Sequence, residues 1–367
     1  MDDRYAGAAR SSLASEAGGN EPVVGYRGVR SNLLLLIVSS CVGLVSAEGL
    51  ARLLIPVRNV GRSFSIYDPF LGKIHKKKFT TKRRCPEFIM TFTSNSEGFR
   101  GPERVHGFLD NGLTVLCVGD SYTEGYGVND GEDFPSLLRE RLGNEFGRQR
   151  FDIINAGVGD TGTGRAVRFL REWKADAAHP VILVHQFSPN DYRDNLHEGI
   201  FSLSPAGDLV ETTGDLPASR IRKLQGVIEG IPGLAESYLF SAALESWKPW
   251  NRWRKAPEAG GEMTDGDGEM LTYRLLSELL RIAETRKWRV ILIEFGLKRR
   301  QSEEIEALGS KGGATVLRIP SKAERPDLYY SQDAHWNKRG HAYVAAHVLI
   351  PVRKEIEGAL SLRRTGN

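Results

Sequence analysis

The chain has 367 residues, of which 40% are hydrophobic and 26% are charged, a composition typical of a globular protein with one large domain or two small ones. The net charge of +4 is too small to argue for nucleic-acid binding. The three cysteines, Cys41, Cys85 and Cys117, match no metal-site spacing and no disulfide framework, so they do not fix the redox compartment.

The N-terminal region divides into a polar tail and an apolar segment. Residues 1–30 are rich in Ala, Gly and Ser, and we expect them to be disordered. Residues 31–55 are apolar around an uncharged core of 15 residues, Leu33 to Ala47, which the flanks extend to the ~20 residues of a spanning helix. We interpret this segment as an uncleaved transmembrane anchor. A cleaved signal peptide, suggested by the small residues at 45–47, and a buried or amphipathic helix are the alternatives.

Residues 56–110 are predicted to form a basic connector. Within twelve positions and with no acid among them stand seven basic residues: Lys73, Lys76, Lys77, Lys78, Lys82, Arg83 and Arg84. A solvated loop is one interpretation of this run. Binding to an anionic surface, either lipid headgroups or a charged glycan, is the other.

From residue 111 to 360 short apolar runs alternate with helical patterns, which predicts a parallel sheet covered on both faces. In such sheets the site forms at the carboxyl ends of the strands. The expected strands are Thr114–Val118, Phe151–Asn155, Val181–His185, Arg289–Glu294 and Thr315–Ile319. The expected helices are Phe134–Phe146, one near Arg165–Ala175, and a final one from Lys338 that is kinked or broken at Pro351.

Residues 196–268 interrupt the alternation and are interpreted as an inserted cap. Trp247, Trp250 and Trp253 fall within this insertion, interleaved with basic residues. Such a cluster is suited to stacking on sugars or to a membrane interface. Ordinary packing of the cap on the core is the alternative.

Two segments far apart in the chain carry the parts of a nucleophilic site. Ser121 follows a predicted strand in Gly119-Asp120-Ser121, and Asp333-Ala334-His335 follows the last one. A serine hydroxyl becomes a good nucleophile when a histidine takes its proton, and that histidine needs a carboxylate to hold its tautomer. We therefore predict Ser121 as nucleophile, His335 as base and Asp333 as its partner.

Two further loops offer donors to an oxyanion. The glycine-rich loop after the second strand contains Gly159 and Asp160, and Asn190 follows the third strand. With the backbone N–H of Ser121, they are the predicted oxyanion-hole residues. Each loop taken alone is equally an ordinary turn. The spacing of His335, His341 and His347 does not suit one helix face, so no metal and no cofactor is predicted.

These segments, in this order, make residues 112–350 resemble the SGNH/GDSL hydrolase family. The resemblance implies a flavodoxin-like three-layer α/β/α sandwich, an esterase activity, and the triad Ser121, Asp333 and His335 with Asn190 as an oxyanion donor. The family's oxyanion glycine aligns with Asp160, and its usual Asp-x-x-His is here Asp-x-His. That shorter spacing is similar to alginate O-acetyltransferase-type envelope proteins, and the connector resembles membrane-anchored bacterial members.

The leading hypothesis is a membrane-anchored serine esterase that removes short acyl groups, such as acetyl, from an envelope glycan or lipid. An O-acetyltransferase that passes the acyl group to a sugar hydroxyl uses the same residues. A non-catalytic glycan- or membrane-binding scaffold is the third hypothesis. The family resemblance favours an extracytoplasmic catalytic domain, and the sequence does not predict an oligomeric state.

Overall fold

The computed structural model describes residues 26–54, 60–104, 113–148, 151–173, 181–216, 226–244, 246 and 265–364. The chain divides into two compact units, Met1–Leu53 and Leu54–Asn367. The predicted disorder of residues 1–25 and the three tryptophans of the insertion lie outside the described residues. Residues 26–30, also expected to be disordered, are helical.

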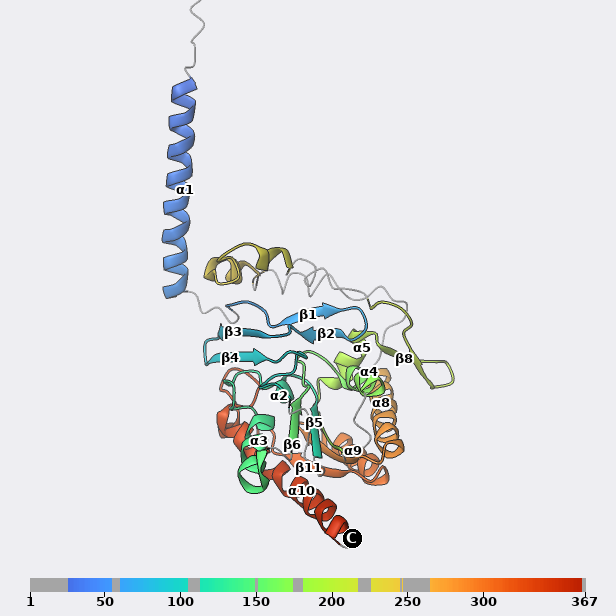
Figure 1. Ribbon diagram of the computed structural model, residues 1–367. Coiled ribbons are helices and arrows are strands. Elements are labelled where there is room, and N and C mark those ends of the chain that lie inside the picture. The colour runs from blue at the N-terminus through green and yellow to red at the C-terminus, as the bar shows by residue number, and fades with distance from the viewer. Residues whose placement is uncertain are drawn as a thin grey trace, which may run out of the picture. The chain divides into compact units, whose positions relative to one another are not determined.

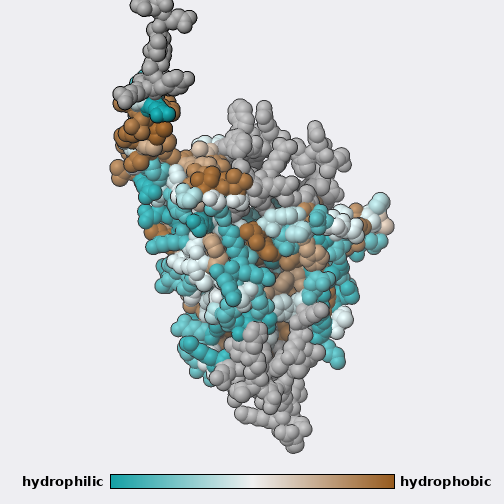
Figure 2. Space-filling model, turned by 45° about the horizontal axis from the view of Figure 1, so that its top comes forward, coloured by the Kyte–Doolittle hydropathy of each residue, from teal (hydrophilic) through white to brown (hydrophobic). Residues whose placement is uncertain are grey.

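The first unit is a long apolar helix, α1 (Tyr26–Leu54). Its segment Arg30–Leu54 has 25 residues and contains an 18-residue window with a mean hydropathy of 2.1. At ~1.5 Å per residue such a helix is longer than the ~30 Å hydrocarbon core of a bilayer, and a signal sequence passes the same test. Its leucine, isoleucine and valine side chains are exposed, as the brown surface in Figure 2 shows. Glu48 and Arg52, the two charges that interrupt the apolar pattern, form an ion pair at 2.9 Å.

The second unit is built on a five-stranded parallel sheet, in the order β11-β10-β7-β5-β6. If the five strands are numbered 1 to 5 in chain order and the sheet is followed from its β6 edge, the order is 2-1-3-4-5. This is the strand order of flavodoxin-like folds, so the predicted fold class is confirmed. The strands are β5 (Leu113–Val118), β6 (Phe151–Asn155), β7 (Val181–Phe187), β10 (Arg289–Phe295) and β11 (Thr315–Ile319).

Helices cover both faces of the sheet (Figure 1). Because side chains alternate along a strand, Val115 and Cys117 pack with α3 and α10, whereas Leu116 and Val118 pack with α4, α8 and α9. The helices of the sandwich are α3 (Phe134–Phe146), α4 (Thr163–Glu172), α8 (Asp265–Thr285), α9 (Arg299–Lys311) and α10 (Lys338–Arg364).

The start of α3 follows a local sequence signal. Asp133 caps α3 by accepting the N–H of Ser136 at 3.1 Å, and Pro135 stands in its first turn. Of the kink or break expected at Pro351, the break is wrong, because α10 continues through Pro351. Proline removes one backbone hydrogen bond, but Val348 and Val352 on either side are fully buried in the core and hold the helix in place.

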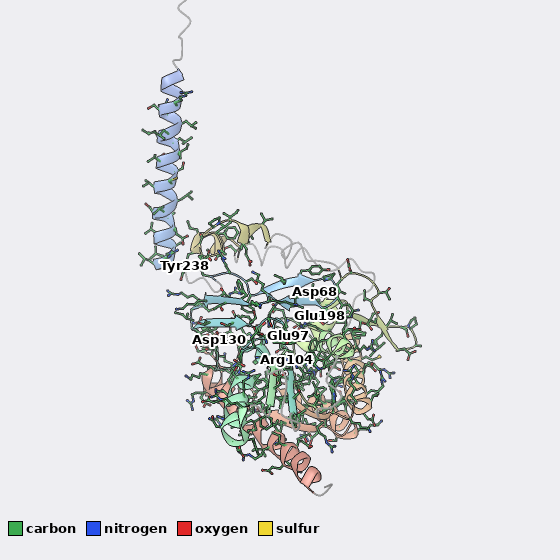
Figure 3. All side chains as sticks on the ribbon, viewed as in Figure 1. Asp68, Glu97, Arg104, Asp130, Glu198 and Tyr238 are labelled. Carbon is green, nitrogen blue, oxygen red and sulfur yellow. The ribbon has the colours of Figure 1, made fainter. Side chains whose placement is uncertain are left out.

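The predicted connector is folded into two antiparallel hairpins that belong to the second unit. Its core residues Phe64, Met90 and Phe92 pack together, with Tyr126 and Tyr330 of the sandwich against them. Arg104, labelled with Glu97 in Figure 3, pairs with Glu97 at 3.3 Å and with Asp152 of β6 at 2.6 Å. The hairpin strands are β1 (Ser65–Asp68), β2 (Gly72–His75), β3 (Phe79–Arg84) and β4 (Ile89–Ser94).

The insertion is partly described. It starts within α5 (Asp191–Glu198), continues as the hairpin β8 (Phe201–Leu203) and β9 (Leu209–Glu211), and is helical at 226–230 and 238–244. The 226–244 segment contacts the connector, since Gly61 N–H donates to Ala235 O at 3.0 Å. Helix α8 begins at Asp265, three residues before the insertion was expected to end.

Candidate active site

The candidate residues follow the carboxyl ends of four of the five strands, as expected for a parallel sheet. Ser121 comes after β5, Gly159 after β6 and Asn190 after β7. Asp333 and His335 stand in the long segment between β11 and α10. Of the residues predicted from sequence, only Trp247, Trp250 and Trp253 cannot be placed, because they lie outside the described part of the chain.

Ser121 is fixed by a tight turn from β5 into the short helix α2 (Ser121–Glu124). Asp120 caps that helix by accepting the N–H of Tyr122 at 2.9 Å. Gly119 adopts a φ of 154°, and a Cβ there would lie 2.5 Å from Thr123 Oγ1. A Cβ on Gly157 would lie 2.4 Å from the backbone nitrogen of Glu124. Gly157 is thus required by the close approach of the loops after β5 and β6, and Gly119 by the tight turn into α2 and its contact with Gln186 of β7.

Ser121, His335 and Asp333 form a continuous hydrogen-bonded chain. Ser121 Oγ lies 2.7 Å from His335 Nε2, the distance expected for a nucleophile and its base. Asp333 Oδ1 accepts a hydrogen bond from His335 Nδ1 and another from His335 N at 2.9 Å. Because the carboxylate only accepts, Nδ1 carries a proton, and Nε2 of the neutral ring is left as the acceptor for the serine hydroxyl.

The carboxyl of Asp333 stays ionised at neutral pH. Burial raises its pKa, but the hydrogen bonds and charge of His335 and the charge of Lys322 outweigh this and lower the pKa below its ordinary value. The rings of Tyr122 and Tyr126 each lie 4.8 Å from the imidazole of His335. These two contacts restrict the orientation of the imidazole ring.

The predicted oxyanion donors differ in their availability. The N–H of Gly159 donates to Glu124 Oε1 at 2.8 Å, so this amide is already engaged, contrary to the role expected for it. Asp160 has a φ of 54°, the left-handed conformation that usually belongs to glycine. Asn190 Nδ2 donates to Asp120 Oδ2 at 2.8 Å and to Asp194 Oδ2 at 3.0 Å. An oxyanion would have to displace one of these two acceptors from Asn190.

A buried acidic cluster surrounds Asn190. Ser188 Oγ donates to Asp120 Oδ2 at 2.9 Å, and Ser188 N–H donates to Asp191 Oδ2 at 3.0 Å. Burial raises the pKa of Asp120, and burial together with the charge of Asp120 raises the pKa of Asp191 well above its ordinary value. This environment favours the neutral form of the Asp191 carboxyl, which relieves the repulsion between the two carboxyl groups.

A second set of residues, which the sequence did not indicate, contacts the loop after β6 that carries Gly159 and Asp160. His75 Nε2 lies 2.7 Å from Glu124 Oε1, the atom that also accepts the Gly159 N–H, and both side chains are almost fully buried. Lys73 Nζ donates to Gly159 O at 2.6 Å and to Asp160 Oδ2 at 2.9 Å. The Gly159 backbone is thus held at its N–H by Glu124 of α2 and at its C=O by Lys73 of the connector. No local motif marks His75, Lys73 or Glu124, because their partners are distant in sequence.

Other polar residues of the region serve structure. Arg100 is 1% exposed and donates to four backbone carbonyls, so its guanidinium is not available to a substrate. His341 is buried against Trp336, and His347 donates to Tyr343 O at 2.8 Å. Within the described ranges no group of three or more His, Cys, Asp or Glu residues is arranged to hold a metal.

Comparison with known proteins gives a family match for the first part of the sandwich. Residues 115–249 match the model of the GDSL-like Lipase/Acylhydrolase family. The matched segment contains Ser121 and Asn190 and ends before Asp333. It agrees with the expected class of enzyme, a hydrolase of ester bonds, and does not specify the substrate.

The individual proteins that this chain resembles are distant in sequence. An uncharacterized protein of Mycoplasma pneumoniae is 25% identical over 136 residues, 37% of this chain but only 15% of that protein. LAE5, an alpha/beta hydrolase enzyme from the metagenome of Lake Arreo, Spain, is 13% identical over 65% of this chain and 94% of its own, with a TM-score of 0.38. AlinE4, an SGNH-hydrolase family esterase, is 18% identical over 66% and 96%, with a TM-score of 0.33.

Proposed function

We propose that the protein is a serine esterase in which Ser121, His335 and Asp333 form the catalytic triad. The hydrogen bond of 2.7 Å between Ser121 Oγ and His335 Nε2 carries this proposal, because it joins a nucleophile at a strand end to a base oriented by a carboxylate. The unbroken series of hydrogen bonds from Ser121 through His335 to Asp333 argues against a scaffold that has lost its activity.

In the proposed reaction, His335 Nε2 takes the Ser121 proton as Oγ attacks the ester carbonyl. The backbone N–H groups of Ser121 and Asp160 and the amide of Asn190 donate to the oxyanion. Protonated His335 then gives its proton to the departing alcohol, and the acyl group stays on Ser121. Water attacks the acyl-enzyme with His335 as base, which releases the acid. Asp333 stabilises the imidazolium in both steps without accepting its proton.

We further propose that the acyl group is short, such as acetyl, and that it is carried by an envelope glycan or lipid. The resemblance to membrane-anchored envelope proteins and the long apolar helix α1 support this assignment. In it, α1 is an uncleaved anchor, the catalytic unit is extracytoplasmic, and Trp247, Trp250 and Trp253 contact the substrate.

The test is hydrolysis of p-nitrophenyl acetate, butyrate and octanoate by the full-length protein and by Ser121→Ala. We expect rates that fall with acyl length and a loss of about 10⁴-fold or more in the variant at an unchanged melting temperature. Equal rates for Ser121→Ala and wild type would refute the mechanism. A second assay adds a sugar acceptor, since acylated sugar formed in preference to free acid would assign the protein as an O-acetyltransferase with the same triad.

A further inference from the structure

The turn between β3 and β4 brings a carboxylate to the segment that carries Asp333 and His335. Residues Cys85 to Phe88 close this turn, with Cys85 N–H donating to Phe88 O at 2.9 Å. Pro86 occupies its second position, where the fixed φ of proline favours a turn. Glu87 follows Pro86 and faces residues 331–333 of the segment between β11 and α10.

Glu87 accepts hydrogen bonds from three consecutive backbone amides. Its Oε1 accepts the N–H of Ser331 at 2.7 Å and the Ser331 hydroxyl at 2.6 Å. Its Oε2 accepts the N–H of Gln332 at 2.8 Å and that of Asp333 at 2.7 Å. Successive amides that converge on one anion form a nest, an arrangement that binds anions through the backbone alone.

A cation holds the opposite side of the same segment. Lys322 Nζ donates to Ser331 O at 2.9 Å and to Asp333 O at 3.1 Å. The backbone of residues 331–333 is therefore fixed between the carboxylate of Glu87 on its N–H side and the ammonium of Lys322 on its C=O side.

Asp333 connects Glu87 to the imidazole of His335. The N–H of Asp333 is bound by Glu87, while its Oδ1 binds both N and Nδ1 of His335. Phe88, next to Glu87, packs against Tyr126 at 5.4 Å, and Tyr126 lies 4.8 Å from His335. The hairpin turn thus supports His335 both through Asp333 and through an aromatic contact.

We propose that Glu87 is a positioning residue that sets the Asp333–His335 pair against Ser121, an inference that rests on the proposed esterase function. Glu87 touches no reacting atom and acts through the backbone of residues 331–333. A displacement of about 1 Å in a catalytic group can lower the rate about 100-fold, so the predicted effect is on kcat rather than on substrate binding.

The experiment compares Glu87→Ala, Glu87→Gln and the control Glu324→Ala in the full-length protein. Glu324 is a matched control because it also accepts a backbone N–H and a hydroxyl, both from Ser321 at 2.8 Å, at the far end of the same segment. We expect kcat on p-nitrophenyl acetate to fall about 10- to 100-fold in Glu87→Ala and less in Glu87→Gln, with KM within about threefold.

Two readouts separate positioning from general stability. Formate should restore part of the lost kcat in Glu87→Ala only, because the three amides remain and can bind a small carboxylate. Hydrogen exchange should accelerate in the peptide spanning residues 331–335 in Glu87→Ala, whereas Glu324→Ala leaves that peptide unchanged. This exchange measurement does not depend on activity.

The outcomes that overturn the proposal are distinct from those that overturn the function. The positioning role is refuted if Glu87→Ala is as active as an active wild type. It is also refuted if the loss of kcat in Glu87→Ala equals the fraction of unfolded protein and formate does not restore it. A folded wild type that hydrolyses no ester refutes the proposed function instead.

Discussion

His75 and Glu124 form a buried pair against the loop after β6, with His75 Nε2 2.7 Å from Glu124 Oε1. The same oxygen accepts the N–H of Gly159 at 2.8 Å, and His75 Nδ1 faces Gly98 O at 3.2 Å. A residue of the connector is therefore joined through one carboxylate to the loop beside the nucleophile. The connector and the sandwich depend on each other at this point.

Glu124→Ala should destabilise the protein by about 3–5 kcal/mol, because it leaves His75 and the Gly159 N–H buried without their partner. Burial raises the pKa of Glu124, but the hydrogen bond and charge of His75 outweigh it and lower the pKa below 4.5. Its stabilisation is thus present above pH 4.5 and lost as the pH falls through the lower folded-state pKa. Urea unfolding should show a larger difference from wild type at pH 7 than at pH 3.

A surface carboxylate provides the control for that prediction. Glu97 pairs with Arg104 at 3.3 Å with 37% of its side chain exposed, so Glu97→Ala should cost less than about 1 kcal/mol. A Glu124 variant no less stable than Glu97→Ala, or one equally destabilised at both pH values, would contradict the role given to the buried pair.

Asp333→Asn should lower kcat about 10²- to 10⁴-fold without unfolding the protein, because an amide does not hold the tautomer of His335. The pKa of Asp333 is lowered, so the wild-type carboxyl stays ionised above its ordinary value of 3.8. The loss should therefore persist across the neutral range. Asp327→Asn, which removes a surface partner of Arg325 at 2.8 Å, should retain activity and serves as control.

The parallel sheet could be predicted because its signal is local. The strands Phe151–Asn155 and Thr315–Ile319 and the helix Phe134–Phe146 were expected at the bounds observed, since apolar runs and a capping Asp-x-Pro mark them. The site position follows from the same pattern, because loops after parallel strands meet at one sheet edge.

The residues that hold the site could not be predicted, because their signals are long-range. Glu87 is separated from Asp333 by 246 positions and Lys73 from Asp160 by 87. A run of basic residues is typical of a solvated or anion-binding surface, yet Lys73 pairs with Asp160 and Lys76 pairs with Glu229. Only the fold pairs these charges, so composition alone misassigned them.

Asn190→Ala should lower kcat about 10²- to 10³-fold if its amide donates to the oxyanion. Asn195 is a matched control on the same helix, because it is buried and bonded to Gly164 N at 2.8 Å and to Thr272 Oγ1 at 2.8 Å. Asn195→Ala should lower the melting temperature but leave kcat unchanged when the rate is divided by the concentration of folded protein. The reverse pattern, a destabilised but fully active Asn190→Ala, would restrict Asn190 to bridging Asp120 and Asp194.

Glu198 should make the protein less stable as the pH rises. Burial raises its pKa to about 8 although Gly162 N–H donates to Oε1 at 2.8 Å, and its Oε2 has no hydrogen-bond partner among the described residues. Because the pKa of Glu198 is higher in the folded than in the unfolded protein, its contribution to the free energy of unfolding is full below pH 4.5. This contribution is lost as the pH rises to about 8, a loss of at most roughly 5 kcal/mol. Glu198→Gln should flatten this decline in unfolding measurements from pH 5 to 9, and an unchanged slope would contradict the assignment.

The ion pair within α1 gives a test of the anchor. Glu48 and Arg52 lie one turn apart and pair at 2.9 Å, which lessens the penalty of placing two charges in an apolar span. Glu48→Ala should therefore weaken membrane integration by up to about 3 kcal/mol, whereas the double variant with Arg52→Ala should integrate at least as well as wild type. Resistance to alkaline extraction measures this. Equal extraction of the single variant and wild type would show that the pair does not contribute, and release of all three would refute the anchor.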